Sequence, residues 1–112
     1  RRHGANAERP TDVIVPRHSD RHADRQAAAD RCASAGLRLV NAVSRFAMVS
    51  PAAQLGEGVA VLAGAVLNAS ASVADGAIVN TRASIDHDVR VGPFAHVAVG
   101  ASLAGGVTVG PR

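Results

Sequence analysis

The side chains best suited to chemistry in this sequence form one tripeptide, Asp86-His87-Asp88. Histidine loses its proton near neutral pH, so it can accept a proton from an attacking group, and a carboxylate beside it stabilises the imidazolium that forms. Adjacent residues of an extended chain point to opposite sides, so we expect only one of the two carboxylates to face the ring. Taken alone, a histidine at such a position is more often a solvated surface residue than a catalyst.

Cys32 is the single cysteine of the chain, so it cannot form an internal disulfide. It lies in an Ala-rich stretch, and we interpret it as a small buried thiol and not as a nucleophile. A reducing, cytoplasmic compartment fits this cysteine usage.

The composition points to a small domain with an unusual core. The chain has 112 residues, 47% of them hydrophobic and 19% charged, with two Phe and no Trp or Tyr. A core of Ala, Val, Leu and Ile without aromatics suggests packing by repetition. The longest apolar stretch, Val59–Leu67, is too short to span a bilayer, so no membrane anchor is expected. The sequence begins without Met, and we expect it to be a fragment of a longer protein.

The formal net charge of +3 is confined to the first part of the chain. Residues 1–45 hold nine Arg and five acidic residues, whereas residues 46–112 hold three Arg and four acidic residues. No aromatic side chains alternate with these arginines, as a surface that stacks nucleic-acid bases would require. Nucleic-acid binding is therefore not expected.

From residue 43 onward every sixth residue is aliphatic. The column consists of Val43, Val49, Leu55, Val61, Leu67, Val73, Val79, Ile85, Val91, Val97, Leu103 and Val109. A second column, two residues before each member from Val49 onward, contains only Ala and Val. A helix face recurs at 3.6 residues and a strand face at 2, so a period of six indicates extended segments with a corner every six residues. Three hexads, or eighteen residues, then complete one coil of a triangular prism.

This prism predicts where each column lies. The aliphatic column fills the interior, the small column lies where the walls bend, and strands of successive coils stack in parallel. Glycines are expected at the corners, where a relaxed backbone is useful. These glycines are Gly56, Gly58, Gly64, Gly76, Gly92, Gly100, Gly105, Gly106 and Gly110.

Residues 1–42 follow another pattern. Thr11–Val15 is typical of a short buried strand that Pro16 ends. Asp20–Ala35 is predicted as a helix, and its proposed apolar stripe consists of Ala23, Ala27, Ala28 and Cys32. Ser19 or Asp20 can cap its start, and Gly36 suits the left-handed residue at its end. With a strand beginning at Leu37, the order indicates a βαβ unit.

The hexads resemble the [LIV]-[GAED]-x-x-[STAV]-x repeat of left-handed β-helix acyltransferases. The stretch from Asn80 to Gly110 is similar to the sialic-acid O-acetyltransferase family, which includes the bacillosamine-type nucleotide-sugar N-acetyltransferases. The resemblance covers roughly residues 37–112. It implies a mainly β fold: a partial α/β remnant of a Rossmann-like domain over residues 1–42, then a left-handed parallel β-helix over residues 43–112, truncated at its C-terminus. It also implies acetyl transfer from acetyl-CoA to a sugar amine or hydroxyl, without a metal.

The same resemblance assigns roles to individual residues. His87 falls on the family's catalytic histidine and Asp88 on the acid that assists it. His96 falls on a histidine near the acetyl-CoA thioester, and Gly105 on a backbone amide near the thioester oxygen. Two further positions, Asn80 and Asp86, match polar residues beside the family's active site and are expected to bind substrate.

Each of these roles has a structural alternative. His96 can be a packed interface histidine, Asn80 a corner residue with left-handed backbone, and Asp86 a solvated carboxylate. Phe94 is interpreted as an aromatic plug between subunits.

Three positions depart from the family pattern, namely Arg82, Pro93 and Val99, where Gly, an acid and Pro are usual. Arg82 adds bulk and charge near a sugar pocket, so the sequence does not identify the acceptor sugar.

Two other classes of function compete with acyl transfer. A zinc enzyme of the γ-carbonic-anhydrase kind needs three histidine ligands, and the repeats offer only His87 and His96. A structural or assembly β-helix without catalysis is the other alternative.

The spacing of the two histidines predicts the assembly. Nine residues is half of a coil, so His87 and His96 lie on opposing parts of one triangle whose walls are about 16 Å wide, at roughly 3.3 Å per residue. We therefore expect a homotrimer with sites between subunits, which the family resemblance also implies.

Overall fold

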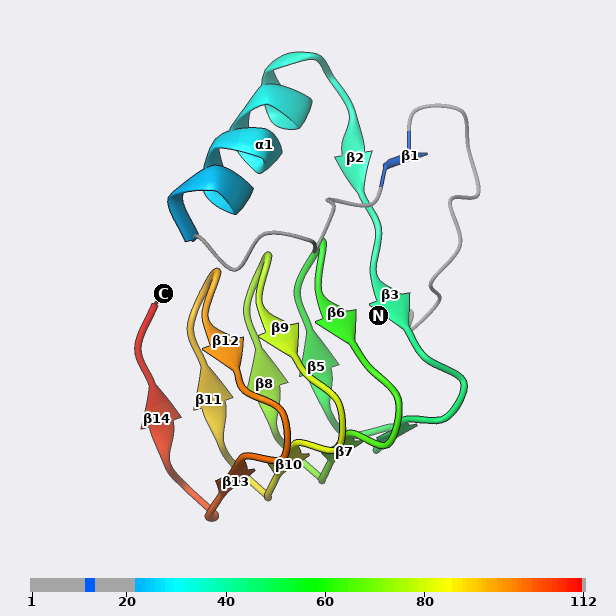
Figure 1. Cartoon of the computed structure of the whole chain (residues 1–112), viewed down its shortest axis with the longest axis vertical. Helices are drawn as coiled ribbons and strands as arrows, with labels where there is room; N and C mark the ends of the chain where they lie inside the picture. The colour runs from blue at the N-terminus through cyan, green and yellow to red at the C-terminus, as the bar shows by residue number, and fades with distance from the viewer. Residues whose placement is uncertain (1–11, 14–21, 112) are drawn as a thin grey trace.

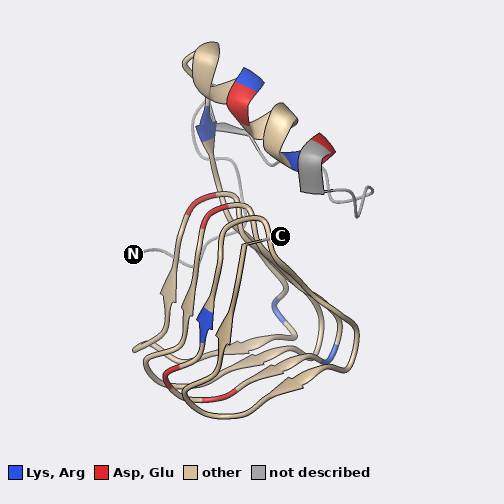
Figure 2. Ribbon diagram, turned by 90° about the vertical axis from the view of Figure 1, so that its left-hand side faces the viewer, with Lys and Arg blue, Asp and Glu red and all other residues tan. Residues whose placement is uncertain are grey.

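The hexads wind into a triangular prism, which Figure 2 shows in cross-section and Figure 1 from the side. The computed structural model describes residues 12–13 and 22–111, and the side chains of residues 24–111. Each wall of the prism is a parallel four-stranded sheet with one strand from every coil. Strands eighteen residues apart pair in register, so that Ser84 lies opposite both Val66 and Ser102.

The three walls repeat in the same order along the chain. The first wall consists of β3 (Ala42–Val43), β6 (Ala60–Val61), β9 (Ile78–Val79) and β12 (His96–Val97). The second wall consists of β4 (Met48–Val49), β7 (Val66–Leu67), β10 (Ser84–Ile85) and β13 (Ser102–Leu103). The third wall consists of β5 (Gln54–Leu55), β8 (Ser72–Val73), β11 (Arg90–Val91) and β14 (Thr108–Val109).

The aliphatic column fills the interior, as the period of six predicts. Its members from Leu55 to Val97 are at most 4% exposed, and those at the two ends of the stack are partly buried and pack against the same core. The small column also faces the interior, immediately after each corner, and is buried from Ala53 to Ala95. Two inward residues per hexad thus supply the core, and the small one leaves room for the aliphatic side chains of the other walls.

The corners have a left-handed residue at the fourth position of the hexad. Glycine occupies it in five of the predicted corners, for example at Gly64 and Gly100. Ser70, Arg82, Asp88 and Phe94 also have φ near +60°, a conformation that non-glycine residues adopt at a cost of roughly 1–2 kcal/mol. The other four glycines, Gly56, Gly92, Gly105 and Gly110, do not have positive φ. The backbone conformation therefore does not require glycine at these four positions.

Three of these glycines instead allow a close approach between coils. A Cβ at Gly56 would collide with the Asp75 carboxylate, and one at Gly92 would lie 2.7 Å from the Pro111 nitrogen. At Gly105 the neighbour would be His87.

The α/β segment before the prism contains β1 (Asp12–Val13), α1 (His22–Ser34) and β2 (Arg38–Leu39). Strands β1 and β2 pair in parallel, so the predicted βαβ order is confirmed. The predicted cap at Ser19 or Asp20 lies outside the described residues, as does most of the predicted first strand. Gly36 has φ +75°, and the Leu37 N–H donates to the Cys32 carbonyl at 2.9 Å, which ends α1 as expected.

The buried face of α1 differs from the predicted alanine stripe. Arg25 and Ala29 are buried, whereas Ala27 is exposed and Cys32 is only partly buried. The reason is that Arg25 reaches a corner of the prism, where its Nη2 donates to the Phe94 carbonyl at 2.6 Å. The face of the helix that carries this bond therefore turns inward.

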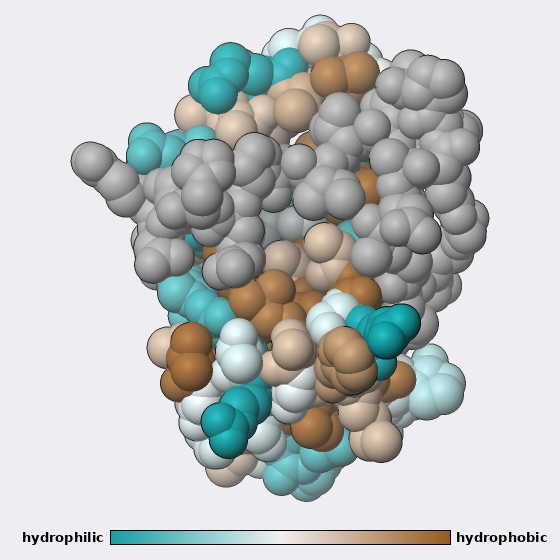
Figure 3. Space-filling view, turned by 45° about the vertical axis from the view of Figure 1, so that its right-hand side comes forward, coloured by the Kyte–Doolittle hydropathy of each residue, from teal (hydrophilic) through white to brown (hydrophobic). Residues whose placement is uncertain are grey.

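Large hydrophobic side chains also reach the surface. Phe46 and Met48 are 67% and 69% exposed, and Val99 and Val107 are exposed as well. Figure 3 shows hydrophobic side chains among polar ones on one face of the molecule. Within the described part of the chain, no helix is long and apolar enough to cross a bilayer.

Candidate functional site

His87 stands at the corner between β10 and β11. The chain leaves the interior after Ile85, and Asp88 takes the left-handed conformation that turns it into the next wall. This turn directs the side chains of His87 and Asp88 outward, where they are 63% and 65% exposed. Both are therefore accessible to a substrate.

The carboxylates of Asp86 and Asp88 have different hydrogen-bond partners, as the sequence predicts. His87 Nδ1 lies 3.1 Å from Asp88 Oδ2, so Asp88 is the carboxylate that faces the ring. Asp86 instead accepts the backbone N–H of His87 at 2.7 Å and the side-chain amide of Asn68 at 3.2 Å. Asp86 thus fixes the backbone at the corner and is not merely solvated.

These contacts alter the acid–base properties of the corner. The hydrogen bond with Asp88, followed by the charge of Asp86, raises the pKa of His87 above its usual 6.5. The hydrogen bonds from the His87 backbone and from Asn68 lower the pKa of Asp86. In the neutral ring, Nδ1–H donates to Asp88, and Nε2 keeps the lone pair with which a base acts.

Gly105 lies directly beside this basic nitrogen in the next coil. A Cβ at Gly105 would be 2.5 Å from His87 Nε2, and the Gly106 N–H donates to the His87 carbonyl at 3.0 Å. The absence of a side chain at position 105 is what allows the ring to lie there. The structure therefore brings His87, Asp86, Asp88 and Gly105 together at one corner.

Asn80 and His96 form a separate pair. Asn80 Nδ2 lies 3.0 Å from His96 Nε2, and Asn80 Oδ1 accepts the Thr81 N–H at 2.7 Å. The alternative of a left-handed corner residue was wrong for Asn80, because the positive φ falls on Arg82 two residues later.

The two groups of residues lie on opposing parts of the prism. His96 belongs to β12 in the first wall, whereas His87 lies at the corner that joins the second and third walls. A single chain therefore does not combine the two histidines in one site.

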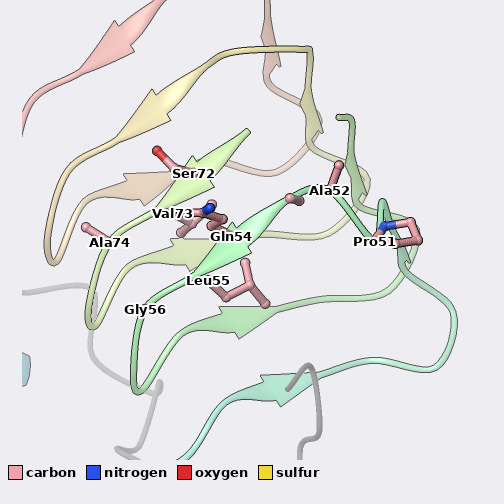
Figure 4. A pocket seen from close by; sticks show the side chains of 9 residues that line it. Pro51, Ala52, Gln54, Leu55, Gly56, Ser72, Val73 and Ala74 are labelled. Carbon is pink, nitrogen blue, oxygen red and sulfur yellow. The ribbon is translucent and has the colours of Figure 1, made fainter. Parts of the chain in front are cut away.

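A polar groove lies on the third wall next to the His87 corner. One part of it, about 400 Å³, is lined by Ala52, Gln54, Ser70, Ser72 and Arg90. The adjoining part, about 570 Å³, extends along β5 and β8 and is shown in Figure 4. Arg90, on β11, supplies the only charged side chain in these linings.

Sequence reasoning missed Asn68 and Arg90. The signal for Asn68 was available, because it precedes Asp86 by eighteen residues, one coil, and therefore stacks on it. The hexad repeat gives no signal that Arg90 lines a groove, because the groove depends on the side chains of neighbouring coils.

Two of the residues singled out in the sequence pack against the preceding coil. The stem of Arg82 would lie 2.9 Å from a Cβ at Gly64, and the ring of Phe94 lies against Gly76. Among the described residues, no three His, Cys, Asp or Glu side chains are grouped so that they could hold a metal ion. The zinc-enzyme alternative thus lacks a ligand set in this part of the chain.

Comparison with known proteins identifies similar solved structures, although no protein-family model matches the sequence. A variant of perosamine N-acetyltransferase from Caulobacter crescentus, with one histidine replaced by asparagine and with CoA and GDP-perosamine bound, has 40% identity and a TM-score of 0.82. The match covers 87% of this chain and 45% of that one. PerB from the same organism, also with CoA and GDP-perosamine, has 36% identity and a TM-score of 0.77 over 89% of this chain and 56% of that one.

The acetyltransferase domain of PglB from Neisseria gonorrhoeae FA1090 is similar at 30% identity and a TM-score of 0.71, over 83% of this chain and 54% of that one. The chain thus spans about half the length of these proteins. The predicted resemblance to nucleotide-sugar N-acetyltransferases is confirmed, and so is the fold class of a hexapeptide β-helix preceded by a short α/β segment.

Proposed function

We propose that this chain carries the acceptor-activating part of an acetyltransferase that moves acetyl from acetyl-CoA to an amine or hydroxyl of a nucleotide-linked sugar. The observation that carries the proposal is the His87 corner, where an exposed histidine bonded to Asp88 presents Nε2 beside Gly105. The similar structures support it, since they bind CoA and GDP-perosamine and two of them are variants of one histidine. A single cysteine fits a cytoplasmic location.

In the proposed reaction His87 acts as general base. Nε2 takes a proton from the acceptor amine or hydroxyl as its nitrogen or oxygen attacks the thioester carbonyl. The Gly105 N–H donates to the carbonyl oxygen as it gains negative charge. The carbon–sulfur bond then breaks, and the imidazolium returns the proton to the departing thiolate of CoA. Asp88 stabilises the imidazolium between these two steps.

The second half of each site comes from another subunit in this proposal. His96 is on the wall opposite the His87 corner, so a neighbouring copy must bring its His96 to the thioester. Three copies related by a threefold axis give three equivalent sites. The division expected from the sequence, between residues 42 and 43, falls within β3, so we place the start of the β-helix at Ala42.

The polar groove is the proposed path of the acceptor. It lies on the N-terminal side of His87 along the prism, whereas Gly105 lies on the C-terminal side. Acceptor and thioester then approach His87 from opposite directions. Arg90 suits the phosphate groups of a nucleotide sugar.

The test is an acetyl-transfer assay with acetyl-CoA and GDP-perosamine, in which the release of free CoA thiol is measured. We expect thiol release that depends on the amino sugar. Binding of acetyl-CoA without transfer to any amino sugar nucleotide would contradict the proposal, and absence of acetyl-CoA binding would favour a structural β-helix.

A further inference from the structure

Asp86 uses one carboxylate oxygen for both of its hydrogen bonds. Its Oδ1 accepts the backbone N–H of His87 at 2.7 Å and the side-chain amide of Asn68 at 3.2 Å. Within the described residues, no group donates to Oδ2. The carboxylate is thus held through one oxygen, and the other oxygen is left for water or for a bound ligand.

The orientation of the Asn68 amide follows from its partner. An ionised carboxylate only accepts hydrogen bonds, so the atom of Asn68 that faces Oδ1 must be the donor Nδ2. The backbone places this donor, because the Asn68 N–H donates to the Ile85 carbonyl at 2.9 Å. Asn68 is therefore held in register one coil before Asp86, beside the residue that precedes it.

The surroundings of Asp86 make this donor important. No other side chain in residues 24–111 donates to Asp86, and the equivalent position in the next coil is Ala104. The bond from the His87 backbone, followed by the bond from Asn68, lowers the pKa of Asp86, and His87 is the charged group that acts on it. Asp86 is therefore ionised throughout the pH range in which His87 titrates, and the two bonds to Oδ1 fix where this negative charge lies.

We propose that Asn68 is a positioning residue of the acceptor site, which holds the Asp86 carboxylate so that Oδ1 fixes the His87 backbone and Oδ2 is left for the acceptor. The inference rests on the proposed function, in which the acceptor approaches His87 from the N-terminal side of the prism. Asn68 lies on that side, whereas Gly105, where the thioester is placed, lies on the other side. Loss of Asn68 should therefore affect the acceptor and not acetyl-CoA.

Hydrogen exchange of the His87 amide, measured by NMR on the full chain, tests the contact independently of activity. In Asn68→Ala the Asp86 carboxylate loses one of its two donors, so Oδ1 is held less firmly against the His87 N–H. We expect this amide to exchange about 2- to 10-fold faster, the range that follows from the loss of one hydrogen bond. An unchanged exchange rate would overturn the proposal.

Ser50→Ala is the matched control. Ser50 occupies the same hexad position at the same corner, one coil before Asn68, and its Oγ accepts the Ala52 N–H at 3.1 Å. This variant also loses a side-chain hydrogen bond of the corner, but one that does not involve Asp86, so exchange at His87 should be unchanged. Equal acceleration in the two variants would mean that the corner loosens as a whole, and would refute a specific role of Asn68.

Kinetics tests whether Asn68 serves the acceptor through Asp86. In an active enzyme, Asn68→Ala should raise the KM of the sugar nucleotide about 2- to 10-fold and leave the KM of acetyl-CoA unchanged. Asp86→Ala should raise the KM of the acceptor at least as much. Adding Asn68→Ala to Asp86→Ala should then have no further effect, because the two residues act as a unit. Effects that multiply, or a raised KM of acetyl-CoA, would contradict the proposal.

The two measurements also separate this inference from the proposed function. An enzyme that transfers no acetyl would refute the proposed function and, with it, the role of Oδ2, whereas faster exchange in Asn68→Ala would still show that Asn68 holds Asp86. Unchanged exchange at His87 in an enzyme that does transfer acetyl would refute the role of Asn68 alone.

Discussion

At the residue scale, the two carboxylates at the His87 corner have different roles. Asp88 binds the imidazole of His87, and Asp86 binds the backbone beside it. The sequence could predict that only one carboxylate faces the ring, because neighbours in an extended chain point apart. The alternation of side chains could not predict which one. The family resemblance assigned Asp88, and the left-handed backbone of Asp88 accompanies that arrangement in the structure.

His87→Ala should lower acetyl transfer by about 10²- to 10⁴-fold and leave acetyl-CoA binding nearly unchanged, because only the proton acceptor is lost. Steady-state kinetics together with calorimetric binding of acetyl-CoA checks this. Turnover at the unaltered rate would remove His87 from the mechanism.

The pH dependence of kcat/KM should reveal the contact between His87 and Asp88. Because Asp88 raises the pKa of His87, the base is protonated and inactive up to a higher pH than an isolated histidine would be. In Asp88→Asn the pKa of His87 should fall, so the acid limb of kcat/KM should move to lower pH while the maximal rate decreases. A limb that does not move would show that Asp88 does not act on His87.

At the element scale, the register of the hexads was predictable and the backbone at the corners was not. The aliphatic column predicts the interior, because an aliphatic residue recurs without exception at every sixth position from Val43 to Val109. Glycine is an incomplete signal for the left-handed position. Arg82, Asp88 and Phe94 occupy that position in three successive corners. Gly105 does not have positive φ, and its lack of a side chain instead lets the His87 ring come close to it.

Val79→Asp or Ile85→Asp should unfold the prism, because each buries an unpaired carboxylate in the core. The cost is several kcal/mol, and small domains are stable by only about 5–15 kcal/mol. Ser84→Asp, on the outward side of the same strand as Ile85, is the control and should melt close to the parent. Thermal melting of Val79→Asp or Ile85→Asp within a degree or two of the parent would refute the register.

Gly105→Ala should impair the site without unfolding the chain. The new methyl group would lie against His87 Nε2 and displace the ring, although the backbone at this position does not require glycine. Gly110→Ala, with no atom within 4 Å of its Cβ, is the matched control. Equal activity of the two variants at equal melting temperature would mean that His87 does not act beside Gly105.

At the scale of the whole molecule, the fold separates the two histidines that the proposed reaction needs. His96 and His87 lie on opposing parts of one prism. In the proposed function, the site therefore requires a neighbouring copy. The sequence could predict this separation from the nine-residue spacing. The side chains of Phe46 and Met48 are exposed in the single chain, which is consistent with a surface that a neighbouring subunit covers in the proposed assembly. Sedimentation at micromolar concentration should show a trimer.

The most direct test of the composite site is complementation between two inactive variants. His87→Ala and His96→Ala chains are prepared separately, mixed under conditions that allow subunits to exchange, and assayed for acetyl transfer. Hybrid trimers contain interfaces at which an intact His87 meets an intact His96, so part of the activity should return. A mixture that stays as inactive as its components, or an active enzyme that sediments as a monomer, would contradict the composite site.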